Sequence, residues 1–271
     1  MSSLSATRCA WIDGIALWSP TLPGWERARP ILRGEAEPAA PLRRPAPELL
    51  PAAERRRAPD TVALAIEVAA AAVAAAALDP RELASVYVSA HGDLAISDHM
   101  CAELAGAAPM ISPTRFHNSV HNAPAGYWSI GSGCMRASTA LSAYLASFAA
   151  GLLEALVQVT CDGAPLLLFG ADIAAVGPLA TVNRSRGLLA AALVLGPQRR
   201  PQSSIALDWS LGPAAAPPEL RTAAARALAD NALAAALPLY EALATLGAEP
   251  VELRLPLGDS LCLEIRLRPA T

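Results

Sequence analysis

Histidine is scarce in this sequence and is confined to its first half, because the four histidines end at His121 in a chain of 271 residues. The five cysteines are an odd number without paired spacing, which argues against a disulfide-stapled extracellular domain. The first residues lack the charged, apolar and small-residue regions of a signal peptide. We therefore expect a protein of the reducing cytoplasm.

A basic stripe and a clear membrane span are also missing. The formal net charge is −3, and the arginines are scattered or lie in loops, as at residues 55–57, so nucleic acid is not an expected partner. The most apolar stretch, residues 62–78, is mostly alanine, contains Glu67 and is slightly too short to cross a bilayer. We interpret it as a buried or half-buried helix.

Apolar residues are abundant, at 54% of the chain with a mean hydropathy of +0.35. This composition is typical of a globular protein with a substantial core, organised as one large domain or two small ones. Short strands at residues 10–17, 84–89 and 165–170 alternate with helical patterns at residues 60–78 and 145–160. The alternation predicts an α/β fold with a mixed, mostly parallel sheet covered by helices on both faces.

The pattern changes in two places. Residues 27–57 are rich in proline and charge without a sustained period, which predicts a surface loop. The last part offers a strand, a helix over residues 218–247 with a kink at Pro238, and two more strands. We therefore divide the chain into a region 1–200, which includes the Pro-rich loop, and a strand-helix-strand-strand element, residues 201–271, packed on the same core.

Several motifs then occur in the order of a known family. A His-Gly-Asp turn at residues 91–93 precedes a helix, and Asn-Ala-Pro-Ala-Gly-Tyr-Trp-Ser-Ile at residues 122–130 precedes the strand Ser-Thr-Ala-Leu-Ser-Ala at residues 138–143. Leu-Leu-Leu-Phe-Gly-Ala-Asp follows at residues 166–172. Together they resemble the N-terminal half of β-ketoacyl synthases, and most of all the short synthase-like proteins of aryl polyene pigment clusters. The resemblance covers roughly residues 9–195 and implies a thiolase-like fold with a strongly shortened C-terminal half.

By this resemblance the position of the family's cysteine nucleophile is occupied by Leu145. Two anchors, the helix that begins at Asn122 and the strand end at Asp172, align the chain with the family's pattern in the same register. A leucine cannot form the acyl thioester that condensation needs, and no histidine follows to complete the site. Chain-length factors have also lost this cysteine, so the resemblance implies a non-catalytic subunit that pairs with an active ketosynthase.

A second register stays open because Ser-Ile-Gly-Ser-Gly-Cys at residues 129–134 imitates the Ser-Ile-Ala-Thr-Ala-Cys run of a working synthase. Cys134 would then be the nucleophile, and Arg136 could help to lower the pKa of its thiol from about 8.5. This register would put residues 138–143 inside the nucleophile helix and leave surplus residues before the next strand. We interpret Cys134 as an inert turn residue.

The resemblance also implies tunnel and interface positions. In chain-length factors the helix after the His-Gly-Asp turn lines a tunnel at the subunit interface, and its bulky residues stop the growing chain. The matching positions, Leu94, Ser97 and Cys101, share one helical stripe by their spacing, although core packing explains such a stripe equally well. Residues 138–143 are expected to pair with their counterpart across a two-fold axis. The implied interface residues are Asn122, Tyr127, Trp128, Ser138, Thr139 and Leu141.

No metal or cofactor is expected. His117 and His121 are four residues apart, which zinc sites use, but a third ligand with suitable spacing is not apparent. Gly131 and Gly133 form a Gly-x-Gly fragment without the preceding strand and following acidic residue of a dinucleotide site.

Three functions are compatible with these observations. The leading hypothesis is a chain-length-factor type subunit, not an enzyme on its own, that binds a ketosynthase and shapes the acyl tunnel in fatty-acid or polyketide-type (aryl polyene) biosynthesis. Through that complex it would meet an acyl carrier protein. The second is a small β-ketoacyl synthase or acyltransferase that uses Cys134. The third is a homodimeric thiolase-fold scaffold that recruits acyl carrier protein.

Overall fold

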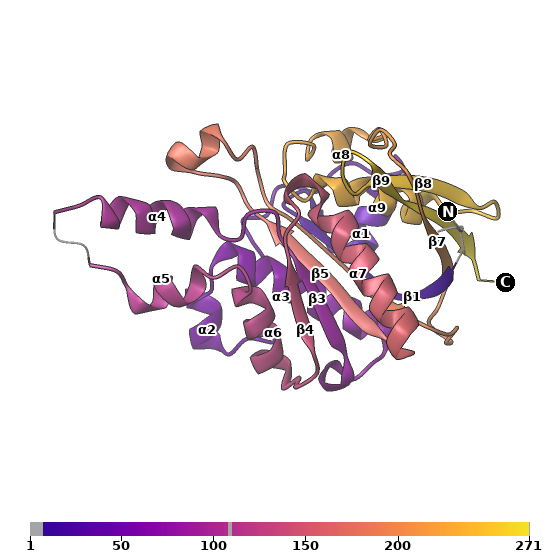
Figure 1. Ribbon diagram of the computed structural model, residues 1–271, viewed down its shortest axis with the longest axis horizontal. Coiled ribbons are helices and arrows are strands. Elements are labelled where there is room, and N and C mark those ends of the chain that lie inside the picture. Colours follow the sequence, from indigo (N-terminus) through magenta and orange to yellow (C-terminus); the bar gives the residue numbers. More distant parts are fainter. Residues whose placement is uncertain (1–7, 108–109, 271) are drawn as a thin grey trace.

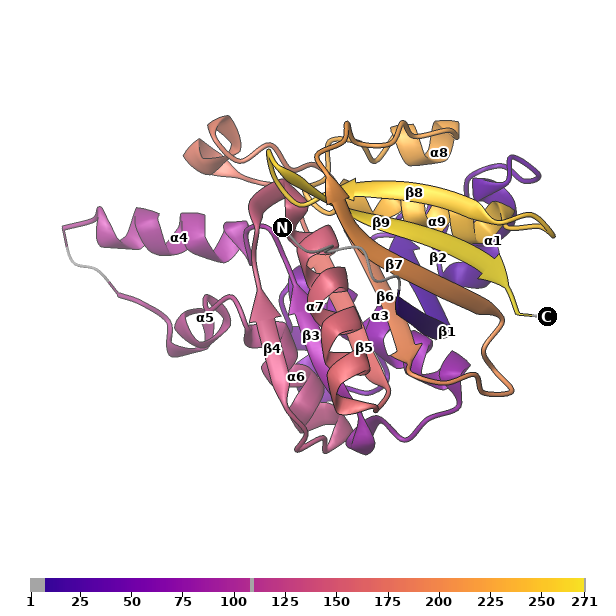
Figure 2. The same ribbon diagram turned by 45° about the vertical axis from the view of Figure 1, so that its right-hand side comes forward.

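The computed structural model describes residues 8–107 and 110–270, and in that part of the chain all strands join one sheet of nine (Figure 1). Their spatial order is β4-β3-β5-β6-β1-β7-β9-β8, and β2 pairs only with the end of β1. Figure 2 shows β4 at one end of the sheet and β8 at the other. The strands are β1 (Arg8–Ser19), β2 (Leu22–Pro23), β3 (Ala84–Val88), β4 (Ser138–Leu141), β5 (Leu166–Asp172), β6 (Leu189–Gly196), β7 (Ile205–Pro213), β8 (Val251–Pro256) and β9 (Leu261–Pro269).

Parallel pairing is limited to the β4 end of this sheet. β3 pairs in parallel with β4 and β5, and the pairs from β5 to β8 are antiparallel. The expected α/β fold with a mixed sheet is therefore confirmed, but the expectation of mostly parallel pairing is wrong. The loop from β8 to β9 is short and joins antiparallel neighbours, whereas parallel neighbours such as β3 and β5 need long crossovers.

Helices cover both faces of the sheet, as expected. α3 (Asp60–Ala76) and α6 (Ala123–Ser132) cover one face; α7 (Ser147–Asp162), α9 (Leu237–Thr245) and α1 (Trp25–Leu32) cover the other. The remaining helices are α2 (Ala52–Arg57), α4 (Leu94–Leu104), α5 (Pro113–Asn118) and α8 (Ala223–Arg226), with short 3-10 helices η1 (Pro80–Glu82), η2 (Tyr144–Ala146), η3 (Gly177–Thr181) and η4 (Ala234–Ala236).

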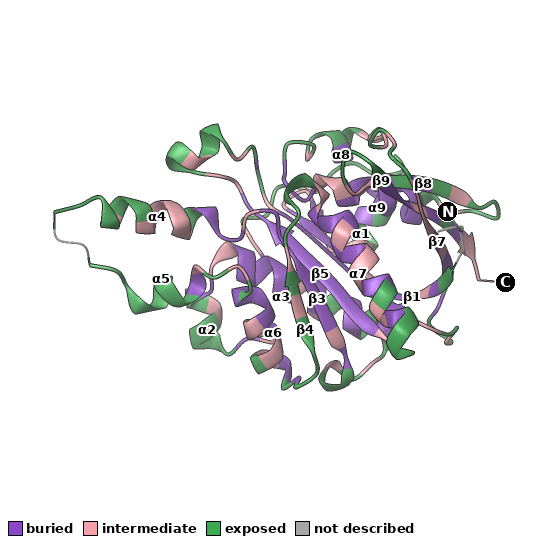
Figure 3. Ribbon diagram, viewed as in Figure 1, coloured by how far each residue is buried: buried purple, intermediate pink, exposed green. Residues whose placement is uncertain are grey.

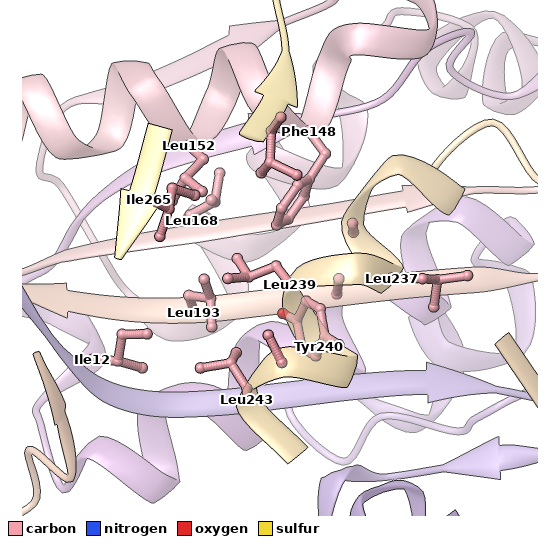
Figure 4. Packing of buried hydrophobic residues seen from close by; sticks show 14 of the residues in the cluster. Ile12, Phe148, Leu152, Leu168, Leu193, Leu237, Leu239, Tyr240, Leu243 and Ile265 are labelled. Atoms are coloured by element: carbon pink, nitrogen blue, oxygen red, sulfur yellow. The ribbon is translucent and has the colours of Figure 1, made fainter. Parts of the chain in front are cut away.

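The two faces of the sheet belong to two apolar clusters because side chains alternate along a strand. In β5, Leu168 packs with α7 and α9, whereas the neighbouring Phe169 packs with α3 and α6. Figure 4 shows the first cluster, where Leu168 lies near residues of α7 and Tyr240 lies over β6. The buried hydroxyl of Tyr240 donates to the carbonyl oxygen of Ala192 at 2.9 Å, so the polar end of this ring has a partner.

Two expected elements are corrected. The Pro-rich loop begins later than residue 27, because α1 buries Ala28, Ile31 and Leu32. The single helix over residues 218–247 is instead divided into α8, η4 and α9. Pro238 does not kink a helix but lies in the first turn of α9, where its missing N–H costs no helical hydrogen bond.

One segment of the described chain, Tyr144–Asp162, is long and apolar enough to cross a membrane. It is not the segment 62–78 that the sequence singles out. Phe148, Leu152 and Leu156 of this segment are fully buried in the core cluster against the sheet. Core packing explains its apolar composition.

Candidate functional site

The three parallel strands end at the same edge of the sheet, and polar groups join these ends. The carboxylate of Asp172, at the end of β5, accepts from the hydroxyl of Ser89 at 2.7 Å and from the backbone N–H of Ala90 at 3.0 Å. Ser142, just after β4, donates its hydroxyl to the carbonyl oxygen of Ala90 at 3.0 Å. The turn after β3 is therefore fixed from both neighbouring strands.

Asp172 is the buried centre of this network, with 1% of its surface exposed. Burial raises the pKa of its carboxyl group, and the hydrogen bonds from Ala90 and Ser89 oppose that change. Its backbone carbonyl accepts from the side-chain amide of Asn231 at 3.1 Å, which connects the site to the segment before η4.

A strained elbow lies between β4 and α7, where the family resemblance placed the nucleophile. Tyr144 has φ = 50°, one of two positive values among the non-glycine residues described, and this conformation is costly for a bulky side chain. Ser147 holds the elbow: its hydroxyl accepts from the N–H of Ala143 at 2.9 Å and donates to the carbonyl oxygen of Tyr144 at 2.6 Å. Leu145 follows in η2 and is 52% exposed.

One histidine, His91, contacts this elbow from the β3 side, and His121 lies at the end of β3. The rings of His91 and Tyr144 meet edge to face with centroids 5.4 Å apart, and Nε2 of His91 is buried without a hydrogen-bond partner in the described chain. Nε2 of His121 lies 2.9 Å from the carbonyl oxygen of Ser89. The elbow thus has the imidazole of His91 beside it but contains no thiol, because residues 143–147 read Ala-Tyr-Leu-Ala-Ser.

Cys134 lies elsewhere, in the turn after α6. Its side chain is 5% exposed, and its sulfur donates to the carbonyl oxygen of Leu83 at 3.2 Å. The guanidinium of Arg136 pairs with Glu82. A thiol that is buried and bonded to a backbone carbonyl is poorly placed to attack a thioester, which favours the inert-turn interpretation.

The expected tunnel residues lie on an arm, defined here as α4 and α5, that projects from the sheet (Figure 1). Figure 3 shows that this arm is mostly exposed or intermediate. Leu94 at its base is buried, Ser97 is half-buried and Cys101 is exposed. Core packing therefore does not explain the whole stripe. Asp93 begins α4, because its carboxylate accepts from the N–H of Ile96 and from the hydroxyl of Thr61, each at 2.9 Å.

The expected interface residues divide into two groups. Ser138 is exposed and Thr139 and Leu141 are half-buried on β4, which is the last strand at its end of the sheet. Asn122 and Tyr127 line an open cleft of about 760 Å³ between α2, α5 and α6. Trp128 does not fit the expectation, because its side chain is 1% exposed and packs on Phe169 in the core.

The histidines at spacing four do not act together. His117 packs edge to face on Tyr127 with ring centroids 6.1 Å apart, whereas His121 faces Ser89. Within residues 8–107 and 110–270, no three histidine, cysteine or acidic side chains are grouped as metal ligands. Sequence reasoning missed the roles of Tyr144, His91 and Ser89, since a positive φ at tyrosine leaves no signal in the sequence.

Known structures share this arrangement of strands and helices. The ketosynthase ApeO in complex with its chain length factor ApeC from Xenorhabdus doucetiae matches with a TM-score of 0.71 and 21% identity over 96% of this chain and 98% of the other. The ishigamide ketosynthase/chain length factor matches with a TM-score of 0.71 and 15% identity over 97% and 99%. AntDE:AntF, a type II acyl-carrier protein in complex with its ketosynthase, matches with a TM-score of 0.72 and 11% identity over 97% and 100%.

These likenesses show the thiolase-like ketosynthase fold. A search of the curated proteins finds no match. The family model described as β-ketoacyl synthase, N-terminal domain, matches residues 25–249, which is most of the chain. The protein therefore belongs to the β-ketoacyl synthase N-terminal domain family.

Proposed function

We propose that this protein is a non-catalytic subunit of the chain-length-factor type, which pairs with an active β-ketoacyl synthase in the cytoplasm and shapes the acyl tunnel. The pathway would be of the fatty-acid or polyketide type, such as aryl polyene biosynthesis. The observation that carries the proposal is the elbow: a strained turn before a buried helix, with Tyr144 and Leu145 where a condensing enzyme needs a nucleophile. The scaffold for the reaction is kept while the group that would hold the acyl chain is absent.

The neighbours of the elbow support the same proposal. Condensation also needs donors that stabilise the decarboxylated partner. Family members supply these from the C-terminal half, whereas all four histidines of this chain lie before the elbow. His121 is engaged with the carbonyl oxygen of Ser89, and the chain has no histidine after it. A partner would have to supply the complete catalytic set.

The need for a partner is supported by two exposed features. β4 is short and lies at the end of the sheet, so its outer backbone groups have no neighbouring strand in the described chain. The arm projects beyond the core and carries exposed Leu104 and Phe116 at 58% and 60% exposure. Such surfaces are typical of protein interfaces. The solved complexes of ketosynthases with chain length factors and with an acyl carrier protein support the identity of the partners.

The test is co-expression with candidate ketosynthases from the same organism, followed by co-purification and analysis of product length. Ser97→Trp and Cys101→Trp add bulk to the proposed tunnel wall and are expected to shorten the products while pairing persists. Ala102→Trp is the matched control: it is exposed on the same helix but lies about 100° around from Cys101. Unchanged product lengths in both stripe variants would exclude a tunnel role.

The two other functions predict different experimental results. An acyl thioester that forms an adduct on Cys134, lost in Cys134→Ala, would make the protein an enzyme. A protein that forms only homodimers and co-purifies with acyl carrier protein, with no effect on product length, would be a scaffold.

A further inference from the structure

The open cleft between α2, α5 and α6 has the size of a small-molecule site (Figure 1). Its volume is about 760 Å³, and such sites range from about 300 to 1,000 Å³. Among the described residues that line it, none belongs to α4 or to the elbow at residues 143–147. The cleft is therefore separate from the proposed tunnel and from the position of the missing nucleophile.

The inner part of the cleft is apolar and has spare room. Ala123, Gly126 and Ile130 lie on one face of α6 at helical spacing, and the buried Leu50 faces the same hollow. A Cβ on Gly126 would have no atom within 4 Å. At the mouth, Ile130 is 82% exposed. An apolar chain can thus lie along α6 and cover this side chain without displacing any other.

The charges around the mouth favour an anion. Arg57 lines the cleft, and its guanidinium has no hydrogen bond or ion pair within the described residues. On the same two helices, α2 and α5, the side chains of Arg55, Arg56 and Arg115 are equally without an ion pair in that part of the chain. Arginine binds carboxylates through two parallel N–H donors. Glu54 also lines the cleft, which disfavours a doubly charged phosphate and leaves a carboxylate as the best head group.

The cleft lies between the arm and the body of the protein. α5 belongs to the arm and packs on α4, whereas α6 covers the sheet. His117 of α5 meets Tyr127 of α6 only edge to face, with ring centroids 6.1 Å apart. Both residues line the cleft, so an occupant would contact α5 and α6 together and hold the arm against the body.

We propose that this cleft binds an amphipathic carboxylate of the fatty-acid class, with the chain along α6 and the carboxylate on Arg57. The site goes beyond the proposed function, because it needs neither the ketosynthase nor the tunnel. Binding replaces water on the exposed Ile130 and adds a charge-assisted contact for a guanidinium that has none within this chain.

The experiment is a titration of the whole chain with the fluorescent fatty acid cis-parinaric acid at about pH 8, where its carboxylate is ionised. We expect one saturable site with a Kd below about 100 µM. Dodecanoate should displace the probe, and 1-dodecanol, which has the same chain without the charge, should do so at least about tenfold less well. Amide hydrogen exchange of α5 should slow when dodecanoate is bound.

Two pairs of variants locate the ligand. Arg57→Ala should weaken dodecanoate binding at least about tenfold and leave 1-dodecanol unchanged. Arg56→Ala is its control, because it removes the same charge from the same helix but does not line the cleft. Gly126→Leu fills the inner part and should abolish binding of both compounds, whereas Gly126→Ala should keep it. Thermal unfolding of both glycine variants separates a filled cleft from a lost fold.

Equal binding of the acid and the alcohol, or an Arg57→Ala variant that behaves like Arg56→Ala, would overturn the proposal. Binding that survives in Gly126→Leu would place the ligand elsewhere. A dimer that Gly126→Leu dissociates in light scattering, without any binding of fatty acid, would assign the cleft to a second copy of the chain. The proposed function is tested separately, by co-purification and product length, so either proposal can fail while the other stands.

Discussion

The hydrogen bonds of one side chain, Asp172, affect the whole site. Its carboxylate is almost fully buried yet holds the turn that carries His91, so its ionisation and the geometry of the elbow are connected. Cys134 is a second case, because its thiol is buried and donates to a backbone carbonyl oxygen, which favours the inert-turn interpretation. At this scale, environment rather than residue type decides chemistry.

Asp172→Asn tests the ionisation of this buried carboxyl group. Because burial raises its pKa above the ordinary value of about 3.9, the folded state binds the proton more tightly than the unfolded state. The stability that the folded state gains by binding this proton is fully present below the ordinary pKa. It is lost as the pH rises through the pKa of the folded state. The free energy of unfolding of the unchanged protein relative to Asp172→Asn should therefore fall with rising pH, in urea titrations from about pH 4 upward.

The exposed Asp259→Asn is the control, because it exchanges the same two side chains at the protein surface. If the free energy of unfolding of the unchanged protein instead rises with pH relative to that of Asp172→Asn, the direction of the pKa change is contradicted.

The thiols should differ in reactivity according to their surroundings. Cys101 and Cys161 are exposed and should react with iodoacetamide in the folded protein, whereas the buried Cys134 and Cys262 should react only after unfolding. Cys9 should be slow near pH 8 although much of the residue is exposed, because partial burial of its thiol group and the neighbouring Asp208 raise its pKa to about 11. Mass spectrometry of the folded protein during labelling measures the order in which the cysteines react. Rapid labelling of Cys134 would contradict the inert-turn interpretation.

Helices α6 and α7 show how one residue type has opposite effects in two elements. Gly151 lies on the buried side of α7, where a Cβ would be 2.1 Å from a methyl carbon of Val88. Gly126 lies in the middle of α6 beside the open cleft, where a Cβ would have no atom within 4 Å. Glycine is required for close packing in α7 and has no packing role within this chain in α6.

Gly151→Ala and Gly126→Ala should therefore change stability in opposite directions. Overpacking against β3 should destabilise the first by about 1–3 kcal/mol. The second should gain up to about 1 kcal/mol, because alanine loses less conformational freedom than glycine in a helix. Thermal or urea unfolding of the two variants measures the difference. Stabilisation by Gly151→Ala would show that the helix can move away from the sheet at little cost.

The whole molecule presents an asymmetric sheet whose two ends differ in their cover. At the C-terminal end, β8 and β9 form an antiparallel pair that follows β7. At the other end, β4 offers its outer edge. The N–H groups of Ser85 and Ser89 donate to the carbonyl oxygens of Ala137 and Leu141, so the backbone groups of Ala140, one residue out of phase, face away from β3. We propose that a partner's strand is added at this edge.

Ala140→Pro tests that edge, because proline removes the outward N–H and leaves the pairing with β3 intact. We expect loss of dimer formation, with the ketosynthase or with a second copy, at a nearly unchanged melting temperature. Ala140→Ser keeps the N–H and should assemble normally. Size-exclusion chromatography with light scattering measures the assembly, and a persistent dimer in the proline variant would place the interface elsewhere.

Much of the fold was predictable because local patterns carry it. The apolar run of β5, the long alanine-rich α3 and the alternation in β9 specify their elements, and Asp93 begins α4 where the turn predicts it. The prediction of one helix over residues 218–247 was wrong because the side-chain amide of Asn231 donates to the carbonyl oxygens of Asp172 and Arg186. These tertiary hydrogen bonds outweigh the helical periodicity of the segment. The prediction of Trp128 as an interface residue does not fit its burial, because sequence spacing does not show which face of α6 is buried.

The sequence by itself determined the order of elements, the family resemblance, and the absence of a cysteine at residue 145 and of histidine after residue 121. These depend on residue identity and short-range periodicity, which are written in the chain. Only the tertiary structure decided that antiparallel pairs dominate the sheet and that Tyr144 is strained beside His91. The reason is physical: strand partners and close contacts are chosen by the packing of residues far apart in sequence, where local propensity has no influence.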